Sequence, residues 1–470
     1  MSTRIAVIGA GPGGYAAAFH AADLGMQVTL VDAEPNPGGV CTFKGCIPSK
    51  ALLHAAKVLD EAKHAENFGV WFGKPTIDVN KLRSWKDGVV KKQTGGLGLL
   101  AKARKVTYLQ GKASFVDAKT LSVEASSGGQ QRVEADYIII ATGSRPTKVP
   151  GVSIDSPKVM DSTAALELPD VPARLLIVGG GYIGLELGTV YAALGSKVSV
   201  VEMTDGLLPG ADRDLAAIVA KRMESTCEAI LLETKVTGVS DEKKGLLVTF
   251  EGKNAPKSGR NFDRVLVAVG RRPNSAIGGL DRTRVKVNPR GFIEVDAQRR
   301  TSEPSIFAIG DVAGDPMLAH KASHEARVAV EAIHGQPSVF EPRAIPAVVF
   351  TDPELAWTGL TENEAKQQNR AIEIAKYPWV ASGRAATLDR ADGLTKLIID
   401  PETERILGVG IVGVGAGEMI SEGTLAIEMG ALAADLKLTI HPHPTLSETM
   451  MEAADVFFGE SVHVYKPKRP

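Results

Sequence analysis

Two segments of this chain repeat one pattern, and the repeat restricts its fold more than any other feature. Residues 4–32 read RIAVIGAGPGGYAAAFHAADLGMQVTLVD, and residues 174–202 read RLLIVGGGYIGLELGTVYAALGSKVSVVE. Each segment has an apolar strand pattern, a glycine-rich turn, a helix pattern of small residues and a second strand that ends in a carboxylate. A single G-x-G-x-x-G is a weak signal, but two copies in matched context predict two β-α-β units that bind dinucleotides.

The glycines of the two turns have separate predicted roles. The first permits the tight turn, the second lets the backbone approach a pyrophosphate, and the third lets the helix pack closely on the strand. The phosphates then lie at a helix N-terminus, and the carboxylate 18 residues after the third glycine can accept hydrogen bonds from an adenosine ribose. The matched acids argue against a packing role alone. These residues are Gly9, Gly11, Gly14 and Asp32 in the first unit, and Gly179, Gly181, Gly184 and Glu202 in the second.

The residues after Glu202 indicate which nicotinamide dinucleotide the second unit binds. Met203, Thr204 and Asp205 follow it, so this strand end has no Arg or Lys to accommodate a 2′-phosphate. The carboxylate of Glu202 would itself repel that phosphate. We therefore expect the second unit to prefer NAD over NADP.

The remaining strand patterns indicate how the chain is divided. Residues 136–141, 263–269 and 305–309 are apolar, and each leads into a glycine and a polar residue, as expected where strands end at a cofactor. Residues 345–470 contain no G-x-G-x-x-G and mix strand with helix patterns. There we expect strands at 347–350, 395–399 and 406–414 and helices at 415–430 and 446–457. The predicted fold is α/β, with two Rossmann-like dinucleotide-binding domains and a C-terminal α+β domain.

A cysteine pair follows the first unit, in the sequence GGVCTFKGCIPSK at residues 38–50. A regular helix would hold Cys41 and Cys46 too far apart for a disulfide, so bridging them requires a distorted turn, for which Gly45 supplies the freedom. The pair lies near the expected start of a helix at 49–63, where the pKa of a thiol is lowered and a thiolate is favoured. Metal binding is the main alternative, but this loop has no His or acidic residue to complete a ligand set.

Composition excludes several other classes of function. The chain has 54 Lys plus Arg against 55 Asp plus Glu, so it lacks the basic field that would attract nucleic acid or an acidic membrane surface. No run of about 18 apolar residues predicts a membrane span, and the strand pattern from Met1 to Ile8 leaves no room for a signal peptide. We therefore expect a protein of the cytosol, where its three cysteines do not form a structural disulfide framework.

The motifs of this chain resemble, in their order, those of the pyridine nucleotide–disulphide oxidoreductases. The resemblance rests on GGVCTFKGCIPSK, the two glycine turns, ATGSRP (141–146), VGRRPN (269–274) and FAIGDVAG (307–314), and it covers essentially the whole chain. It implies a redox-active cysteine pair, FAD at the first unit, NAD or NADP at the second and a C-terminal dimerisation domain. The implied limits are 1–149 with 275–344 for the FAD domain, 150–274 for the NAD domain and 345–470 for dimerisation.

The same resemblance assigns residues outside the glycine turns to the cofactors. Lys50 would lie near the flavin ring, Asp311 would bind the ribitol chain, and Glu186 would face the nicotinamide. The flavin site would also include Thr142 and Gly143, and the NAD site would include Gly270. Val40 and Phe43 replace the Thr and Asn common in the family, which leaves the local geometry and redox potential open.

A proton acceptor for the substrate is predicted near the C-terminus, in HPHPTLSE at residues 441–448. Thiol–disulfide exchange needs a thiolate; a His can take the thiol proton near neutral pH, and a carboxylate on its other nitrogen fixes the tautomer. His443 and Glu448 can fill these roles, and they resemble the family's His–Glu pair. In the family the base comes from the second subunit, which implies a homodimer. The alternative is a proline-rich turn before a helix, with Glu448 at the helix N-terminus.

The wording of two motifs indicates a substrate. HPHPTLSE and MLAHKASHEA (317–326) resemble the members that oxidise dihydrolipoamide, although Ser323 and His324 replace an acidic pair often seen there. The expected partner is then the lipoyl domain of a 2-oxoacid dehydrogenase or glycine cleavage complex. A glutathione reductase would need basic residues after the second unit, and a mercuric reductase would need extra cysteines near the C-terminus. The two glycine turns would also suit a transhydrogenase or a flavin-binding redox sensor. However, a transhydrogenase needs no cysteine pair, and a redox sensor needs no His443.

Overall fold

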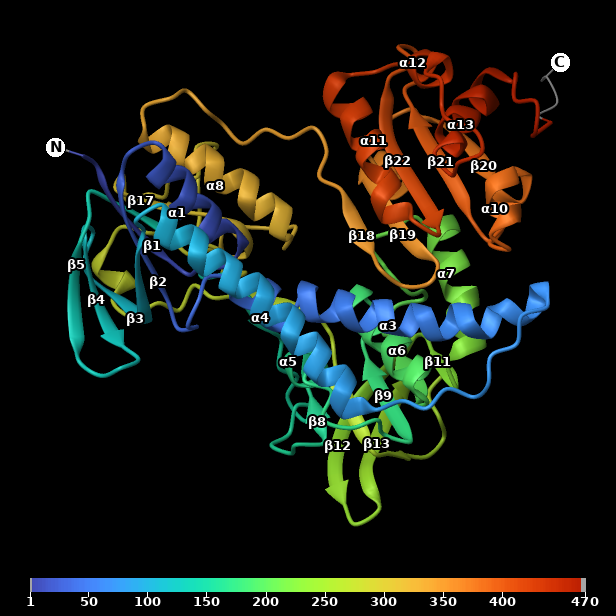
Figure 1. Cartoon of the computed structure of the whole chain (residues 1–470), viewed down its shortest axis with the longest axis horizontal. Helices are drawn as coiled ribbons and strands as arrows, with labels where there is room; N and C mark the ends of the chain where they lie inside the picture. Colours follow the sequence, from blue (N-terminus) through green and yellow to red (C-terminus); the bar gives the residue numbers. More distant parts are fainter. Residues whose placement is uncertain (1, 466–470) are drawn as a thin grey trace.

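The computed structural model describes residues 2–465, which form three regions around the long helix α3, Cys46–His64 (Figure 1). The strands of the first region are β1 Arg4–Ile8, β2 Gln27–Asp32, β3 Thr107–Asp117, β4 Thr120–Ala125, β5 Gln130–Glu134, β6 Tyr137–Ile140 and β17 Ile306–Ala308. They form one sheet in the order β17-β6-β1-β2-β3-β4-β5. The parallel strands β1, β2, β6 and β17 are apolar on both faces, as buried parallel strands require. Since β17 pairs with β6, the chain returns to this sheet after passing through the second region.

Helices cover one face of the first sheet. They are α1 Pro12–Asp23 and α8 Ala319–Ile333, which pack side by side through small residues (Figure 1). Two further helices, α2 Gly39–Lys44 and α4 Val79–Ala103, pack against α3. The 3-10 turns of this region are η1 Ala65–Phe68, η2 Leu280–Arg282 and η3 Gly310–Val312. The first region therefore has the layered architecture that its β-α-β unit predicts.

The second region contains the second β-α-β unit. Its strands are β8 Val159–Met160, β9 Arg174–Val178, β10 Lys197–Val201, β11 Ala229–Leu231, β12 Thr234–Glu242, β13 Gly245–Gly252, β14 Arg260–Phe262 and β15 Arg264–Val267, and its helices are α5 Ser162–Leu166, α6 Tyr182–Leu194 and α7 Arg213–Thr226. A five-stranded sheet has the order β11-β10-β9-β15-β8, and β12, β13 and β14 form a separate three-stranded sheet. Two short strands, β7 Ser144–Pro146 and β16 Arg271–Pro273, pair antiparallel where the chain enters and leaves this region.

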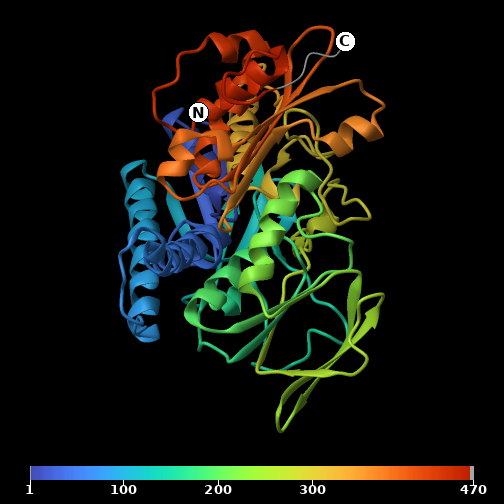
Figure 2. The same ribbon diagram turned by 90° about the vertical axis from the view of Figure 1, so that its right-hand side faces the viewer.

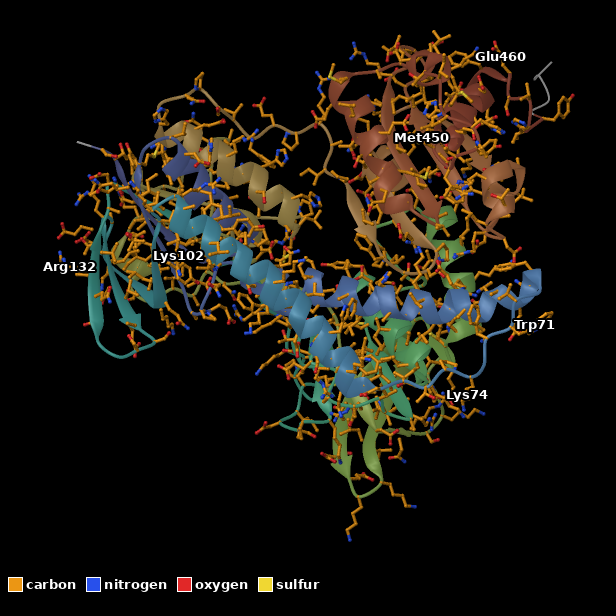
Figure 3. All side chains as sticks on the ribbon, viewed as in Figure 1. Trp71, Lys74, Lys102, Arg132, Met450 and Glu460 are labelled. Atoms are coloured by element: carbon orange, nitrogen blue, oxygen red, sulfur yellow. The ribbon has the colours of Figure 1, made fainter. Side chains whose placement is uncertain are left out.

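The third region is an antiparallel sheet covered by helices, and Figure 2 shows it above the second region. Its strands are β18 Ala347–Val349, β19 Glu354–Gly359, β20 Glu373–Pro378, β21 Leu394–Ile399 and β22 Ile406–Gly413, in the order β18-β19-β22-β21-β20. Its helices are α9 Glu362–Gln367, α10 Gly383–Thr387, α11 Ala416–Met429, α12 Ala433–Leu438 and α13 Glu448–Phe458, with the 3-10 turn η4 Trp379–Ala381. Met450 of α13 is fully buried in this core (Figure 3).

The predicted fold class is confirmed, with two Rossmann-like sheets and a third α+β unit. We propose that the domains have the limits expected from the sequence. Two strands of the third region, β19 and β20, were not predicted; β20 carries charged residues and ends in Pro378, as an edge strand can. The helix expected at 49–63 begins three residues earlier, at Cys46. None of the helices within residues 2–465 combines the length and apolarity that a membrane span requires.

Candidate active site

The two glycine-rich turns have the same hydrogen-bond geometry. In the first, the carboxylate of Asp32 accepts a hydrogen bond from the backbone N–H of Ala10 at 2.6 Å. In the second, the carboxylate of Glu202 accepts one from the backbone N–H of Gly180 at 2.7 Å. The other oxygen of each acid accepts the N–H two residues later. Each acid is thus held beside its turn at the end of a strand, where an adenosine ribose would reach it.

The first and third glycines of each turn lie against one another. Gly9 and Gly179 have φ angles of 97° and 111°, which favour glycine. A Cβ at Gly14 would lie 1.8 Å from the carbonyl oxygen of Gly9, and a Cβ at Gly184 would lie 2.4 Å from that of Gly179. Helices α1 and α6 can therefore approach their strands this closely only with glycine at the third position.

The second glycine of each turn faces open space at a helix N-terminus. A Cβ at Gly11 would meet only the Cα of Gly39, 3.9 Å away, and a Cβ at Gly181 would meet nothing within 4 Å. Gly11 and Gly181 are the N-caps of α1 and α6, and no side chain among residues 2–465 caps either helix. Exposed N–H groups and the helix dipole make such an end a site for phosphate. Both turns therefore fit the pyrophosphate of a dinucleotide.

A cavity of about 360 Å³ connects the first glycine turn with the cysteine pair. Its walls come from α1, the end of β2, α2, the start of α3, the start of α6 and the turn after β17. The predicted site residues that line it are Gly9, Gly11, Asp32, Cys41, Cys46, Lys50, Thr142, Gly143, Glu186 and Asp311. Residues from distant parts of the sequence thus meet around one space that adjoins both units of the repeat.

A second cavity, of about 1120 Å³, lies along another side of α3. Its walls come from α3, α6, α7 and residues 350–354, and Lys74 also lines it. Figure 3 labels Lys74 on the loop that precedes α4. Neither glycine turn lines this space. The first glycine turn and the cysteines line only the smaller cavity, which we therefore take as the redox site. The second turn and Glu202 line neither of these two cavities, and Lys50 is the predicted site residue common to both.

Cys41 lies in α2, and Cys46 is the first residue of α3. Gly45 separates the two helices, and a Cβ there would lie 2.9 Å from the carbonyl oxygen of Val40. The φ angle of Gly45 is −147°, so the close approach of α2, not a left-handed backbone, requires glycine at this position. Both cysteines are thiols in this structure. The break between α2 and α3 places both on the wall of the smaller cavity.

The two thiols differ in their tendency to ionise. A hydrogen bond with Cys41 and the nearby Lys50 ammonium lower the pKa of Cys46 to about 7, against the effect of burial. The hydrogen bond with Cys46, followed by burial, raises the pKa of Cys41 above its usual range. Of the two thiols, Cys46 is therefore the one that ionises near neutral pH, while Cys41 stays protonated.

Lys50, one turn after Cys46, connects the first region with the second. Its ammonium donates a hydrogen bond to Glu186 of α6 at 2.8 Å, and Glu186 is only 4% exposed. The other carboxylate oxygen of Glu186 accepts the backbone N–H of Phe350 at 3.0 Å, and the Lys50 ammonium lies 4.4 Å from the centre of the Phe350 ring. Phe350 was not predicted as a site residue, since it merely follows an apolar strand of the third region and belongs to no motif.

Asp311 lies in η3, directly after β17, and accepts a hydrogen bond from the hydroxyl of Ser144 at 2.5 Å. That hydroxyl accepts one in turn from the guanidinium of Arg271 at 2.7 Å. Ser144 and Arg271 begin the paired strands β7 and β16 and line the cavity. Neither was predicted, although each directly follows a predicted glycine, Gly143 or Gly270, which was the available signal.

The predicted residues Thr142, Gly143 and Gly270 lie where the two connecting strands begin. The hydroxyl of Thr142 donates to the carbonyl oxygen of Asn274 at 2.8 Å, and the Asn274 side chain donates back to the carbonyl oxygen of Thr142 at 2.9 Å. Gly143 and Gly270 have φ angles of 67° and 109°, which favour glycine. Thr142 and Gly143 line the cysteine cavity, whereas Gly270 is not part of its wall.

Val40 and Phe43, which depart from the family pattern, face different surroundings. Val40 is 42% exposed and gives the cysteine cavity an apolar surface. The ring of Phe43 lies against Gly38, where a Cβ would be 3.2 Å from it. Phe43 thus packs against the turn that leads into α2, at a position where the family commonly has the polar residue Asn.

His443 and Glu448 form a pair near the start of α13. The Nδ1 atom of His443 lies 2.9 Å from one oxygen of Glu448, and the other oxygen accepts the N–H of Thr445 at 2.8 Å. Burial opposes ionisation of Glu448, but the Thr445 N–H and His443 outweigh it and lower the pKa of Glu448. The His443 side chain is 78% exposed and does not line the cysteine cavity. Within one chain, the pair and the cysteines are therefore separate.

Two further residues, His441 and Cys227, lie in packed surroundings away from the cysteine cavity. The side chain of His441 is 5% exposed, and its ring nitrogens contact Glu422 at 2.7 Å and the carbonyl oxygen of Thr439 at 2.9 Å. Cys227 ends α7 beside the apolar core, where burial raises its pKa to about 11. Such a thiol is poorly reactive at neutral pH.

A cluster of three carboxylates joins the second and third regions. Asp212 and Asp214, at the start of α7, lie close to Glu362 of α9. The fully buried ammonium of Lys396 lies 2.6 to 2.8 Å from one oxygen of each. These carboxylates thus already bind a cation of the chain itself.

Comparison with known proteins gives consistent matches over this architecture. Residues 3–326 match a family model described as pyridine nucleotide-disulphide oxidoreductase, and residues 345–454 match its dimerisation domain. Dihydrolipoyl dehydrogenase from Haemophilus influenzae is 50% identical over 459 residues, which cover 98% of this chain and 96% of that protein. Dihydrolipoyl dehydrogenase from Geobacillus stearothermophilus is 47% identical over 464 residues, which cover 99% of this chain and 98% of that protein.

Two solved structures have the same fold along nearly their full length. LpdA from Mycobacterium tuberculosis has a TM-score of 0.89 at 26% identity, and the match covers 96% of this chain and 99% of that one. The HOCl-induced flavoprotein disulfide reductase RclA from Escherichia coli has a TM-score of 0.85 at 28% identity, with 97% and 99% covered. The three regions described above therefore occur together in these proteins.

Proposed function

Because the chain belongs to the pyridine nucleotide-disulphide oxidoreductase family, we propose that it is a dihydrolipoyl dehydrogenase that oxidises dihydrolipoamide and reduces NAD. The observation that carries this proposal is the single cavity in which the cysteine pair, the first glycine turn and Glu186 meet. A dithiol oxidised at Cys41 and Cys46 can there pass electrons toward the second unit. Relatives of the same name, about half identical over the full chain, support dihydrolipoamide as the substrate.

The cofactors are FAD and NAD. A bound flavin would supply the two-electron redox chemistry that links the cysteine pair to NAD. For the flavin, Gly11 and the N-terminus of α1 would hold the pyrophosphate, Asp32 the adenosine ribose and Asp311 the ribitol chain. For NAD, Gly181 and the N-terminus of α6 would hold the pyrophosphate, and Glu202 would hold the ribose.

The thiol half of the reaction needs a base and an electrophilic sulfur. His443 removes the proton of the first substrate thiol, while Glu448 on Nδ1 orients the ring and stabilises its charge. The substrate thiolate attacks the Sγ atom of Cys41 in the oxidised pair; a mixed disulfide forms, the Cys41–Cys46 bond breaks, and Cys46 leaves as a thiolate. The second substrate thiolate then closes the lipoamide disulfide and displaces Cys41, which takes a proton.

Cys46 is suited to leave as a thiolate. Its pKa is about 7, because Cys41 donates a hydrogen bond to it and the Lys50 ammonium is near. A thiol with a low pKa is a good leaving group in disulfide exchange. We therefore expect Cys41 to exchange with the substrate and Cys46 to be the cysteine next to the flavin.

Because His443 lies apart from the cysteines of its own chain, a complete active site requires a second subunit. A dimerisation domain is present, and we propose that His443 of one subunit completes the site of the other. The macromolecular partner is the lipoyl domain of a 2-oxoacid dehydrogenase or glycine cleavage complex. The proposed location remains the cytosol.

The decisive test is a substrate panel with the purified holoenzyme. We expect NAD reduction with dihydrolipoamide, and at least a hundredfold less turnover with NADPH and either oxidised glutathione or Hg(II). Cys41→Ser and Cys46→Ser should each abolish dihydrolipoamide oxidation, whereas Cys227→Ser should retain it. A preference for glutathione with NADPH, or near-normal activity of either cysteine variant, would refute the proposal.

A further inference from the structure

The Lys50–Glu186 pair is enclosed by a residue from the third region. The side chain of Lys50 is 33% exposed, whereas that of Glu186 is 5% exposed. Phe350 contacts both partners: its backbone N–H binds one oxygen of Glu186 at 3.0 Å, and its ring lies beneath the Lys50 ammonium at 4.4 Å. The backbone and the side chain of one residue thus bind the two members of one ion pair.

A long lysine side chain needs more than one contact to remain in place. An ammonium is a compact charge on four flexible carbons, and its only hydrogen bond to a side chain within residues 2–465 goes to Glu186. A cation over an aromatic face is attracted by the ring quadrupole, and the ring also restricts the direction from which the ammonium can approach. The Phe350 ring therefore removes freedom that Glu186 alone would leave to Lys50.

We propose that Phe350 is a positioning residue of the redox site, whose ring holds the Lys50 ammonium beside Glu186 and Cys46. This role rests on the proposed function of the Cys41–Cys46 pair. Phe350 does not line the cysteine cavity itself, so it acts through Lys50 and not by contact with the reacting sulfur atoms. The third region thereby contributes to the site within a single chain, independently of His443.

The consequence concerns the thiolate of Cys46. Lys50 is one of the groups that lower the pKa of Cys46, after the hydrogen bond with Cys41. A Lys50 ammonium released from the ring would spend less time near the sulfur, and the thiolate would lose part of its stabilisation. The other groups facing the sulfur come from different elements: Cys41 of α2 and Glu186 of α6.

Two tyrosines near the cysteine pair, Tyr182 and Tyr15, do not ionise in the pH range in which Cys46 titrates. Burial raises the pKa of Tyr182 to about 12, and burial also raises the pKa of Tyr15 above its usual value. Neither phenol therefore changes its charge over the pH range in which Cys46 titrates.

The test compares Phe350→Leu with Phe350→Tyr in the reduced holoenzyme. Leu keeps the backbone N–H to Glu186 and an apolar side chain but removes the ring, whereas Tyr keeps the ring. The rate of iodoacetamide alkylation, followed against pH, gives the pH at which Cys46 is half ionised. We expect Phe350→Leu to raise that pH by about half a unit, a threefold change in the ionisation constant, and Phe350→Tyr to leave it unchanged.

A double-mutant cycle identifies the route of the effect. In a Lys50→Met background, Phe350→Leu should no longer move the titration of Cys46, because the ring has no cation to hold. Phe458→Leu is the matched control, since the Phe458 ring lies 4.9 Å from the Lys437 ammonium, at the end of α13. Its titration curve should match that of the wild type.

Three outcomes would overturn the proposal: an unchanged titration in Phe350→Leu, equal shifts in the Leu and Tyr variants, or a shift that persists in the Lys50→Met background. If Phe350→Leu does not fold, a ring-fluorinated phenylalanine at position 350 keeps the shape and weakens the quadrupole, and the same shift is expected. The alkylation assay contains no lipoamide. A wrong substrate assignment would therefore fail the substrate panel without changing this result.

Discussion

The carboxylate of Glu202 accepts a hydrogen bond from the backbone N–H of Gly180, 22 residues earlier, at 2.7 Å. Its other oxygen accepts the N–H of Thr204 at 2.8 Å. These bonds hold a negative charge at the end of β10, beside the open N-terminus of α6. Asp32 and Ala10 repeat the arrangement in the first unit. The negative charge of Glu202 would repel the 2′-phosphate of NADP bound at the second unit.

Glu202→Ala should therefore weaken NAD binding and reduce discrimination against NADP. Loss of a hydrogen bond to a charged group costs about 1.4 kcal/mol or more, so we expect KM for NAD to rise about tenfold. Removal of the negative charge should lower KM for NADP. Steady-state kinetics with both nucleotides measures the ratio, and Glu228→Ala, on an exposed pair with Arg174, is the control. An unaltered NAD to NADP ratio in Glu202→Ala would contradict this assignment.

Gly14→Ala should abolish flavin retention, because its Cβ would lie 1.8 Å from the carbonyl oxygen of Gly9. The turn must open to relieve this contact, and the N-terminus of α1 would no longer present its N–H groups to the pyrophosphate. Flavin absorbance per polypeptide measures the loss. Gly96→Ala in α4 is the control, since a Cβ there meets nothing within 4 Å and alanine favours the helix by up to about 1 kcal/mol. Full flavin content in Gly14→Ala would argue against this role of the turn.

Cys41→Ala should shift the titration of Cys46 to higher pH. The hydrogen bond with Cys41 is the largest cause of the lowered pKa of Cys46, about 7, and the thiolate predominates above that pH. Without this bond, a higher pH is needed for the same thiolate fraction. Alkylation of the reduced protein, measured from pH 5 to 10, should show the curve moving upward by about one unit or more. Cys227→Ser should not move it, and a Cys41→Ala curve that also stays in place would contradict the pairing of the two thiols.

Heterodimers can show which subunit supplies the base. A dimer of one Cys41→Ser chain and one His443→Gln chain retains one intact site only if His443 acts across the interface. We then expect roughly half the wild-type activity, whereas each mutant homodimer is inactive, because the two sites of a symmetric dimer are equivalent. If the base acts within its own chain, the heterodimer is inactive as well. Differently tagged chains allow the heterodimer to be purified and assayed.

Lys396→Met should destabilise the junction between the second and third regions. The Lys396 side chain is fully buried, and its removal leaves Asp212, Asp214 and Glu362 without their shared cation. Breaking a buried pair by deleting one partner costs about 3–5 kcal/mol in free energy of unfolding. Lys376→Met is the matched control: Lys376 pairs with Asp214 at 2.7 Å but is 42% exposed, so we expect a cost below about 1 kcal/mol. If urea denaturation gave the same loss in free energy of unfolding for Lys396→Met and Lys376→Met, burial of Lys396 would not be the cause of the destabilisation.

Several features of the site could be predicted because each depends on a short stretch of sequence. The glycine turns need glycine for reasons of local geometry, and the structure has Gly14 and Gly184 packed against the first glycines of their turns. His443 and Glu448 are five residues apart, so a single turn before a helix brings them together. The catalytic roles assigned to these residues stay predictions, which the experiments above address.

Other contacts could not be predicted, because they join residues that no motif connects. Ser144 and Asp311 are 167 positions apart, and Phe350 reaches Glu186 across 164. The contact of Phe350 uses a backbone N–H and an aromatic face, which many residues could supply at many positions. Only the packing of the third region against α3 and α6 selects this one.

The amino-acid sequence by itself therefore determined the two dinucleotide units, the cysteine pair and the His–Glu pair, since steric and hydrogen-bond requirements act there over a few neighbouring residues. The tertiary structure decided which groups surround the cysteines. It sets the ionisation of Cys46 through Cys41 and Lys50, and it separates His443 from the cysteine cavity of its own chain. Electrostatic effects depend on distance in space, and a linear sequence does not contain those distances.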